Sequence, residues 1–391
     1  MSGQPRASRG HASQGMGEPR PATRARLDAL HQTLEEATQR QAGYPANLAY
    51  DYSALTPFLR YSLNNIGDPF HESNYQVNTR AIEREVVATF ADLMHLPADE
   101  AWGYVTSGGT EGNMYGLYLA RKLHPDGIVY FSQDTHYSVL KNLSVLNMRN
   151  IMIKSQENGE LDYDDLYETV RIHRDTPVIV MANIGTTMKG AIDDLTRVRG
   201  ILEDLAITNH YIHADAALSG LILPFVEDPQ PYGFDAGIDS ISLSGHKVIG
   251  APLPCGVVLT KNDYVNTVAR SVEYLGTLDT TVPGSRSGFT PLILWYALEH
   301  YGLDGLRTLV GGMLDTAAYA VERFNERGIP AWRNRNSVTV VFPRPAEELV
   351  QAWQLAPLGD IAHVITMPHV TRAMVDDIVD ACSGSSGSTE T

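Results

Sequence analysis

Residues 177–184 read PVIVMANI, a short run that is apolar at nearly every position. A strand with one face in water alternates apolar and polar side chains, so a run without alternation is typical of a strand covered on both faces. Helical or turn-forming stretches separate this run from other short β-rich runs. Those runs occupy 104–106, 128–132, 151–154, 211–214, 240–243 and 256–260. Repeated β–α units of this kind predict an α/β fold with a mostly parallel central sheet flanked by helices.

The same patterns predict how the chain divides. Residues 1–26 read as a disordered tail, and 27–78 as a helix followed by an irregular N-terminal arm. The large domain spans 79–314, where an amphipathic helix precedes the β–α alternation. A small α+β domain follows over 315–382, and the Ser/Gly-rich end, 383–391, reads as a second disordered tail.

Charge, apolar runs and cysteine content limit the binding partners and the cellular location that the chain can have. The 391 residues carry a formal net charge of -16, which argues against a surface for nucleic acid or anionic membrane. No apolar run approaches the length of a membrane-spanning helix, and the N-terminal stretch lacks the apolar segment of a signal peptide. The two cysteines, Cys255 and Cys382, form no CxxC pair. We therefore expect a cytoplasmic protein that binds neither nucleic acid nor membrane.

The first candidate site is the turn SGGT, 107–110, which follows a strand and opens a helix. Sites on a parallel sheet lie beyond the carboxyl ends of its strands, which is where this turn falls. Its backbone N–H groups would face an anion at the helix N-terminus, and the hydroxyls of Ser107 and Thr110 would add donors. A plain helix N-cap explains the same residues, so the turn alone leaves anion binding open.

Three further side chains lie at strand ends. His136 opens a helix after a strand, where a capping role is the alternative. Asp215 ends another strand on the same face as His213, and its burial needs a positive partner unless it caps the next turn. Lys247 follows a third strand with no acidic residue nearby in the sequence. A lysine there either extends its ammonium to solvent or, in a desolvated pocket, has the lowered amine pKa that reaction with an aldehyde needs.

The four features together match one cofactor. An anion-binding turn, a flat imidazole, a buried carboxylate and a reactive lysine correspond to the phosphate, ring face, ring nitrogen and aldehyde of pyridoxal 5'-phosphate. A hydrolase with a divalent metal on His136, His213, Asp215 and His246 is the competing interpretation. It leaves Lys247 and the turn unexplained, and the chain has no HExxH helix, so we predict no metal site.

Six segments carry a resemblance to a known family: WGYVTSGGTEGNMYG (102–116), DTHYSV (134–139), ANIGTTMKGAIDD (182–194), YIHADAALSGLILPFV (211–226), SLSGHKVIGAPLPCGVV (242–258) and GSRSG (284–288). In this order, over residues 43–380, the chain resembles the group II pyridoxal-phosphate decarboxylases. It is most similar to bacterial histidine decarboxylases and to plant serine/histidine decarboxylase-like proteins. The resemblance implies the aspartate aminotransferase-like fold, called fold type I, and a homodimer with shared active sites.

The resemblance also implies a role for each matching position. Lys247 would form the Schiff base with the cofactor, and Asp215 would keep its ring nitrogen protonated so that the ring accepts electrons. His136 and Ala217 would cover the two faces of the ring, with Thr186 near its substituents. The phosphate would be surrounded by Ser107, Gly108, Gly109, Thr110, Ser244 and His246, and by Ser285 of the neighbouring subunit.

The implied reaction is α-decarboxylation of an L-amino acid to a primary amine and CO2. Tyr274 lies in a segment similar to a mobile loop whose tyrosine returns a proton to the product carbon; packing in a hairpin is its alternative role. L-Histidine, giving histamine, is the first choice of substrate. Over residues 67–86, the sequence of the arm resembles the plant group more than the bacterial enzymes. L-Serine or another amino acid therefore remains an alternative substrate. An aminotransferase or lyase on the same fold is a further alternative.

Overall fold

The computed structural model describes residues 19–273 and 276–385, and it divides into two compact units, Met1–Gln41 and Ala42–Thr391. In the first unit, helix α1 (Pro21–Thr38) buries none of its side chains. It begins inside the stretch predicted as a tail, because proline is well suited to the first turn of a helix. The last helix, α11 (Arg372–Ser385), likewise runs into the C-terminal stretch predicted as disordered.

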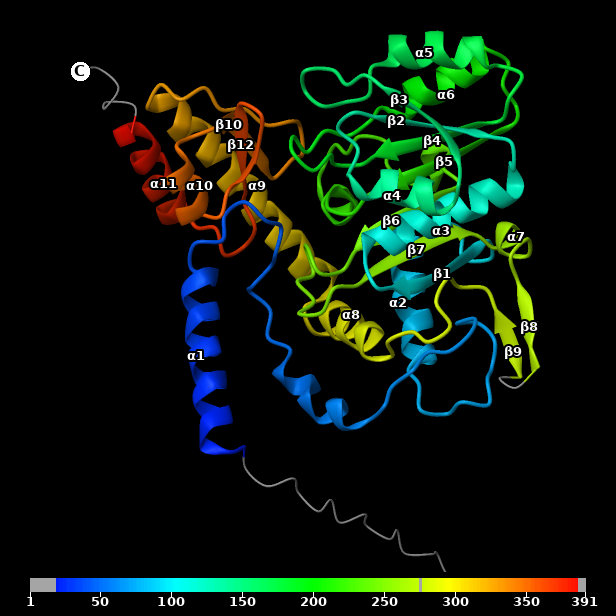
Figure 1. Ribbon diagram of the computed structural model, residues 1–391, viewed down its shortest axis with the longest axis horizontal. Coiled ribbons are helices and arrows are strands. Elements are labelled where there is room, and N and C mark those ends of the chain that lie inside the picture. Colours follow the sequence, from blue (N-terminus) through cyan, green and yellow to red (C-terminus); the bar gives the residue numbers. More distant parts are fainter. Residues whose placement is uncertain (1–18, 274–275, 386–391) are drawn as a thin grey trace, which may run out of the picture. The chain divides into compact units, whose positions relative to one another are not determined.

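The second unit is built on a seven-stranded sheet with the order β1-β7-β6-β5-β4-β2-β3 (Figure 1). Strand β7 runs antiparallel to β1 and β6, and the other neighbours pair in parallel. The predicted mostly parallel α/β sheet is therefore confirmed. Its strands are β1 (Ala101–Thr106), β2 (Ile128–Ser132), β3 (Arg149–Ile153), β4 (Val178–Asn183), β5 (His210–Asp215), β6 (Ser240–Ser244) and β7 (Gly256–Lys261).

Strand β4 lies at the centre of two hydrophobic cores. Val178, Val180 and Ala182 pack into one core, whereas Ile179 and Met181 pack into the other. All five side chains are fully buried. Because successive side chains of a strand point to opposite faces, this alternation confirms that the PVIVMANI run is covered on both sides.

Helices supply the two covering layers (Figure 1). Apolar side chains of α2, α5 and α6 enter the first core, and those of α3, α4 and α7 enter the second. Helices α5 and α6 each begin at an aspartate whose carboxylate accepts two backbone N–H groups of the first turn. The bounds are α2 (Arg80–Leu93), α3 (Gly109–Leu123), α4 (Ser138–Val145), α5 (Tyr163–Ile172), α6 (Leu195–Asp204) and α7 (Asn262–Val265).

The C-terminal part forms a smaller antiparallel sheet, ordered β10-β12-β11. Along the helix that leads into it, α9, the buried side chains change core between Met313 and Ala317. The domain boundary after residue 314 stays a prediction. The remaining helices and strands are β8 (Arg270–Val272), β9 (Thr277–Asp279), α8 (Phe289–His300), α9 (Gly302–Glu326), β10 (Thr339–Pro343), α10 (Glu347–Ala352), β11 (Ala356–Leu358) and β12 (Ile361–Ile365), with short 3-10 turns at 53–60, 219–221, 223–225 and 234–236. Among the helices of the described ranges, none combines the length and apolar character that crossing a membrane requires.

Candidate active site

A cavity of about 200 Å³ lies at the carboxyl ends of the parallel strands. The strand register sets Asn183, at the end of β4, beside Asp215, at the end of β5, and Asp215 beside Ser242 of β6. Parallel pairing therefore brings strand ends that are far apart in sequence to one edge of the sheet. The cavity is lined by nine of the predicted site residues: Gly109, Thr110, His136, Thr186, Asp215, Ala217, Ser244, His246 and Lys247.

Lys247 lines the cavity and is its candidate nucleophile. Burial lowers the pKa of Lys247, and the Asp215 carboxylate opposes that shift. Within residues 19–273 and 276–385, Nζ of Lys247 has no hydrogen-bond or ion-pair partner. An amine held without a partner and shifted toward its neutral form is suited to bind an aldehyde, so this residue fits the pyridoxal group.

The Asp215 carboxylate is held at both oxygens. Oδ1 accepts a hydrogen bond from the backbone N–H of Ala217 at 3.2 Å, and Oδ2 accepts one from Nδ2 of Asn113 at 2.7 Å. The residue is only 8% exposed. A carboxylate that is oriented in this way and faces a cavity can pair with a protonated ring nitrogen.

Two imidazoles border the cavity. Nδ1 of His136 accepts hydrogen bonds from the Ser138 hydroxyl at 2.7 Å and from the Ser138 backbone N–H at 3.3 Å, so the neutral ring carries its proton on Nε2. Nδ1 of His246 donates to the Cys255 carbonyl at 3.0 Å. Burial is the main cause that lowers the pKa of both rings. His136 therefore offers a flat, neutral face.

The N-terminus of α3 borders the cavity through Gly109 and Thr110. A Cβ atom at Gly109 would lie 3.2 Å from Oγ of Ser244 and 3.7 Å from Cβ of Ala217. Glycine thus lets the first turn of the helix approach both segments closely. The N–H groups of that turn, together with Thr110 and the Ser244 hydroxyl, are the donors that a phosphate would use.

Three of the predicted residues that the structure describes do not line this cavity. Ser107 donates from its N–H and its hydroxyl to Oε2 of Glu111 at 2.8 and 2.6 Å. Helix α3 has Gly108 as its N-cap and no side-chain cap hydrogen bond, so Ser107 does not cap the helix either. Ser107 and Ser285 line a separate cavity of about 190 Å³ within the single chain. Gly108 precedes the lining residue Gly109 without lining the cavity itself. Tyr274 lies outside the described residues.

Several lining residues were not predicted individually. Gly43, Tyr44 and Pro45 come from the arm, whereas Ala356, His363 and Ile365 come from the smaller sheet. The two ring nitrogens of His363 lie 3.0 Å from the carbonyl oxygens of Met188 and Gly43, and burial lowers the pKa of the ring. No local motif marks the C-terminal group. Asn113 could have been found, since it lies in the quoted 102–116 motif one helical turn after Gly109.

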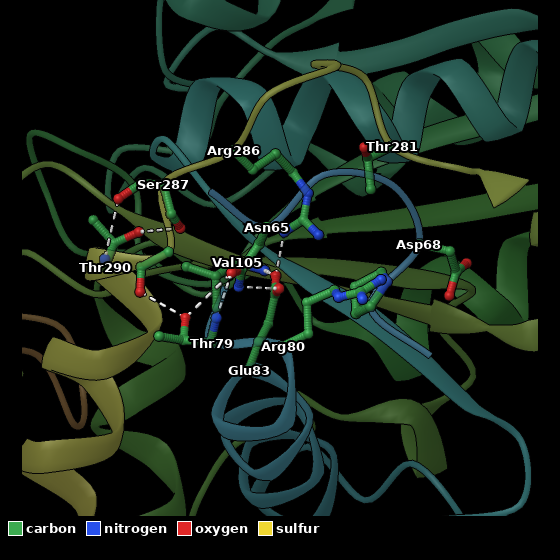
Figure 2. Close-up of polar contacts among 12 residues, drawn as sticks. Asn65, Asp68, Thr79, Arg80, Glu83, Val105, Thr281, Arg286, Ser287 and Thr290 are labelled. Atoms are coloured by element: carbon green, nitrogen blue, oxygen red, sulfur yellow. Dashed lines mark hydrogen bonds and ion pairs between the residues drawn. The ribbon is translucent and has the colours of Figure 1, made fainter. Parts of the chain in front are cut away.

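A buried ion pair anchors the segments around the site (Figure 2). Glu83 of α2 accepts hydrogen bonds from Arg286, from the backbone N–H of Val105 and from Nδ2 of Asn65. Arg286 also donates from Nη2 to the Gly67 carbonyl at 3.0 Å. The pair therefore ties the arm and the 284–288 segment to α2 and β1. Glu83 is fully buried, which its place on a helix with an apolar stripe did not predict.

The competing interpretation was a hydrolase with a divalent metal site. In the part of the chain that the structure describes, no group of three or more His, Cys, Asp or Glu side chains is placed to hold a metal ion. The ring of His213 is engaged at both nitrogens, by Ser240 and by Asn113.

Comparisons with known proteins point to one family. Residues 49–342 match the pyridoxal-dependent decarboxylase conserved domain. The histidine decarboxylase of Morganella morganii is 46% identical over 91% of this chain and 95% of its own. The histidine decarboxylase of Acinetobacter baumannii is 46% identical over 94% of this chain and 97% of its own.

Solved structures agree with this similarity. The L-methionine decarboxylase of Streptomyces sp. 590 superposes with a TM-score of 0.84 at 28% identity, covering 94% of this chain and 96% of that one. The predicted fold type I architecture and the pyridoxal 5'-phosphate cofactor are thereby confirmed. The chain belongs to the pyridoxal-dependent decarboxylases.

Proposed function

We propose that this protein converts L-histidine to histamine and CO2. The observation that carries the proposal is the cavity containing Lys247 and Asp215, in a chain 46% identical over most of its length to proteins named histidine decarboxylase. Pyridoxal 5'-phosphate, when bound, supplies an aldehyde for the substrate amine and a ring that accepts the electron pair left when CO2 departs.

The residues of the cavity supply the remaining requirements. Lys247 would hold the cofactor through Nζ, and its lowered pKa favours the neutral amine that exchange with the substrate amine needs. Asp215 would keep the ring nitrogen protonated. The small side chain of Ala217 and the flat ring of His136 would enclose the two ring faces, which holds the substrate in one orientation and keeps water away.

The α3 N-terminus would hold the phosphate end of the cofactor. Gly109, Thr110, Ser244 and His246 line that side of the cavity. Because these donors belong to backbone and short side chains, they would fix the ring relative to Lys247 at small entropic cost.

Two features support histidine over serine. The segment that departs from the bacterial enzymes, residues 67–86, contributes none of the residues that line the cavity. The arm residues that do line it, Gly43 to Pro45, lie in a part of the arm that resembles the family. L-Serine, giving ethanolamine, remains the alternative that the assay must include.

Purified protein, loaded with pyridoxal 5'-phosphate, should be supplied with single L-amino acids while CO2 and amine products are measured. Histamine and CO2 in equal amounts are expected from L-histidine. Ethanolamine from L-serine without histamine would overturn the substrate, and an oxo acid without CO2 would overturn decarboxylation. Borohydride reduction followed by peptide mapping should place the cofactor on Lys247.

We infer that Tyr274 returns the proton to the product carbon. The support for this role is the resemblance of its segment to a catalytic loop. Replacing Tyr274 with Phe should lower amine formation by about 10²-fold or more while cofactor binding is kept. An unchanged rate of amine formation would remove Tyr274 from the reaction.

We further propose a cytoplasmic homodimer with shared active sites. The arm exposes large apolar side chains, among them Leu59 at 66% and Tyr61 at 53%, which a second copy would cover. Both cysteines, Cys255 and Cys382, are buried. Two cysteines so far apart in the sequence give no disulfide framework, as suits a reducing compartment. Ser285 lies outside its own chain's main cavity, so contact with a neighbour's phosphate needs a second subunit.

Light scattering on the protein as it elutes from a size-exclusion column should give twice the mass of one chain.

Co-expression of Lys247→Ala chains with Ser285→Asp chains tests whether the two subunits share active sites. Each variant alone should be nearly inactive, whereas mixed dimers contain one site in which both residues are intact. No recovery of activity in the mixture, or full activity of Ser285→Asp alone, would contradict shared sites.

A further inference from the structure

A row of buried polar side chains runs behind the cavity and ends on Asp215. The Tyr211 hydroxyl donates to Oγ of Ser240 at 2.8 Å, and Oγ of Ser240 lies 2.6 Å from Nδ1 of His213. Nε2 of His213 lies 3.0 Å from Oδ1 of Asn113, whose Nδ2 donates to Asp215 at 2.7 Å. His213 and Ser240 are fully buried, and Tyr211 and Asn113 are 1% exposed. Because these groups are buried away from bulk solvent, every bond in the row depends on its neighbours.

The direction of each hydrogen bond follows from the carboxylate. An ionised Asp215 can only accept, so Asn113 must turn its NH2 group toward it and its Oδ1 toward His213. Oδ1 can only accept as well, so His213 carries its proton on Nε2. Nδ1 then accepts from the Ser240 hydroxyl, which itself accepts from Tyr211. All donors in the row point toward Asp215.

The charge state of His213 matches this arrangement. Burial lowers the pKa of the ring to about 4, against a smaller opposing effect of Asp215. A protonated ring would carry a second N–H on Nδ1, and the Ser240 hydroxyl could no longer donate to it. The neutral ring is therefore the form that completes the row.

Helix α3 is shaped to admit the histidine. A Cβ atom at Gly116 would lie 2.1 Å from Nδ1 of His213 and 2.4 Å from its Cε1. Any larger residue at this position would push the helix away from β5. Glycine lets α3 lie close enough for Asn113 to reach both His213 and Asp215.

We propose that His213, acting through Asn113, is a positioning residue that holds the Asp215 carboxylate in the orientation and ionised form required by the cofactor's ring nitrogen. This rests on the proposed function only for the identity of the cofactor. It assigns to His213 and Asn113 a contribution to cofactor affinity, which can be measured without any substrate.

The test compares cofactor affinity in variants that keep or remove the donor to Asn113. His213→Leu removes that donor, His213→Gln keeps an amide that can replace it, and Asn113→Asp sets a second carboxylate against Asp215. Apo-protein is titrated with pyridoxal 5'-phosphate and followed by absorbance. Thermal unfolding is recorded with and without the cofactor.

His213→Leu and Asn113→Asp should each weaken cofactor binding by roughly tenfold or more, as happens when the partner of a ligand-holding group is removed. His213→Gln should restore most of the affinity. The gain in unfolding temperature on adding cofactor should shrink in the first two variants and return in the third. Unchanged affinity in Asn113→Asp, or no recovery in His213→Gln, would overturn the proposal.

Thr366→Val serves as the matched control. Thr366 is fully buried in the small domain, where its hydroxyl donates to the carbonyls of Met313 and Val338. Its loss should lower the unfolding temperature of apo and loaded protein equally, with unchanged cofactor affinity. If His213→Leu does not fold, Ser240→Ala replaces it, since it keeps the ring and removes the donor to Nδ1 together with the acceptor of the Tyr211 hydroxyl. Ser240→Ala should weaken cofactor binding several-fold, and unchanged affinity would overturn the proposal.

A wild type that binds the cofactor tightly but releases no histamine would refute the proposed substrate and leave this inference standing.

Discussion

At the scale of single residues, burial sets the charge state of the reactive groups. It is the main cause that lowers the pKa of Lys247, His136, His213 and His246. Asp215, in contrast, accepts two hydrogen bonds that orient its carboxylate. The cavity thus combines bases shifted toward neutrality with one oriented anion. This is the balance that a cofactor with a protonated ring nitrogen needs.

Removing the amine of Lys247 should abolish turnover. In Lys247→Ala the rate of amine formation should fall on the order of 10³-fold or more, because no other side chain replaces the nucleophile. Amine release from L-histidine, measured by chromatography, checks the expectation. Lys154→Ala is the control, since that side chain is 71% exposed at the surface, and its rate should match the wild type.

His213 should make the fold sensitive to acid. Its pKa is about 4 when folded and 6.5 without burial, so between these values the unfolded chain binds the additional proton. Stability therefore falls as the pH drops through this window, by about 3 kcal/mol in total. Urea unfolding of wild type and His213→Gln at pH 7 and pH 4 gives the difference directly.

Other titrating groups contribute equally to the pH dependence of stability in the two proteins, so their contribution cancels in the comparison. Asp193, for example, has its pKa raised by burial to about 6, which acts in the opposite direction but is present in both. An equal loss of stability in wild type and variant between pH 7 and pH 4 would show that His213 is not the group responsible.

At the scale of elements, α3 is the helix that connects the sheet to the site. Gly109, Asn113 and Gly116 follow helical spacing and fall on the face toward β5 and β6. Gly109 meets Ser244, Asn113 bonds Asp215, and Gly116 faces His213. The close approach of one helix face therefore holds both the anion-binding turn and the ring-nitrogen partner.

Gly116→Ala should damage both stability and the site. The added Cβ meets the His213 ring at 2.1 Å, so the helix must shift, at a cost of about 3 kcal/mol. Gly200→Ala in α6 is the control, because nothing lies within 4 Å of its added Cβ. That variant should gain about 0.5 to 1 kcal/mol from the reduced freedom of the unfolded chain. Denaturant unfolding measures both, and equal effects would contradict the packing argument.

At the scale of the whole molecule, buried polar contacts join segments that are far apart in sequence. Glu83 and Arg286 connect the arm, α2, β1 and the 284–288 segment (Figure 2). His363 of the smaller sheet reaches carbonyls of the arm and of the loop after β4. The His363 contacts therefore join two segments that line the cavity, whereas the Glu83–Arg286 pair joins segments outside it.

Breaking the Glu83–Arg286 pair should be costly. Glu83→Gln and Arg286→Met each leave a buried charge without its partner, so each should lower the free energy of unfolding by about 3 to 5 kcal/mol. The double variant should cost clearly less than the sum of the two. Arg171→Met, which breaks the exposed pair with Glu168, should change stability by less than about 1 kcal/mol. Additive single effects would mean that the two side chains act independently.

Local patterns in the sequence were sufficient to predict the architecture and to propose the reactive residues of the site. Unbroken apolar runs identified the strands of the parallel sheet, and polar residues at their ends identified Lys247, Asp215 and His136. Both signals are local, because burial and strand direction are encoded over a few consecutive residues. The family resemblance added the cofactor contacts.

Only the tertiary structure decided which groups surround that core. Ser107 donates to the Glu111 side chain instead of lining the cavity, while His363 enters from the smaller sheet. The bonds from His213 to Asn113 and from Glu83 to Arg286 join residues 100 and 203 positions apart. No periodicity in a sequence specifies such pairs, because a buried hydrogen bond depends on the packing of whole elements against one another. The sequence alone therefore determined the chemistry, and the packing determined how that chemistry is held.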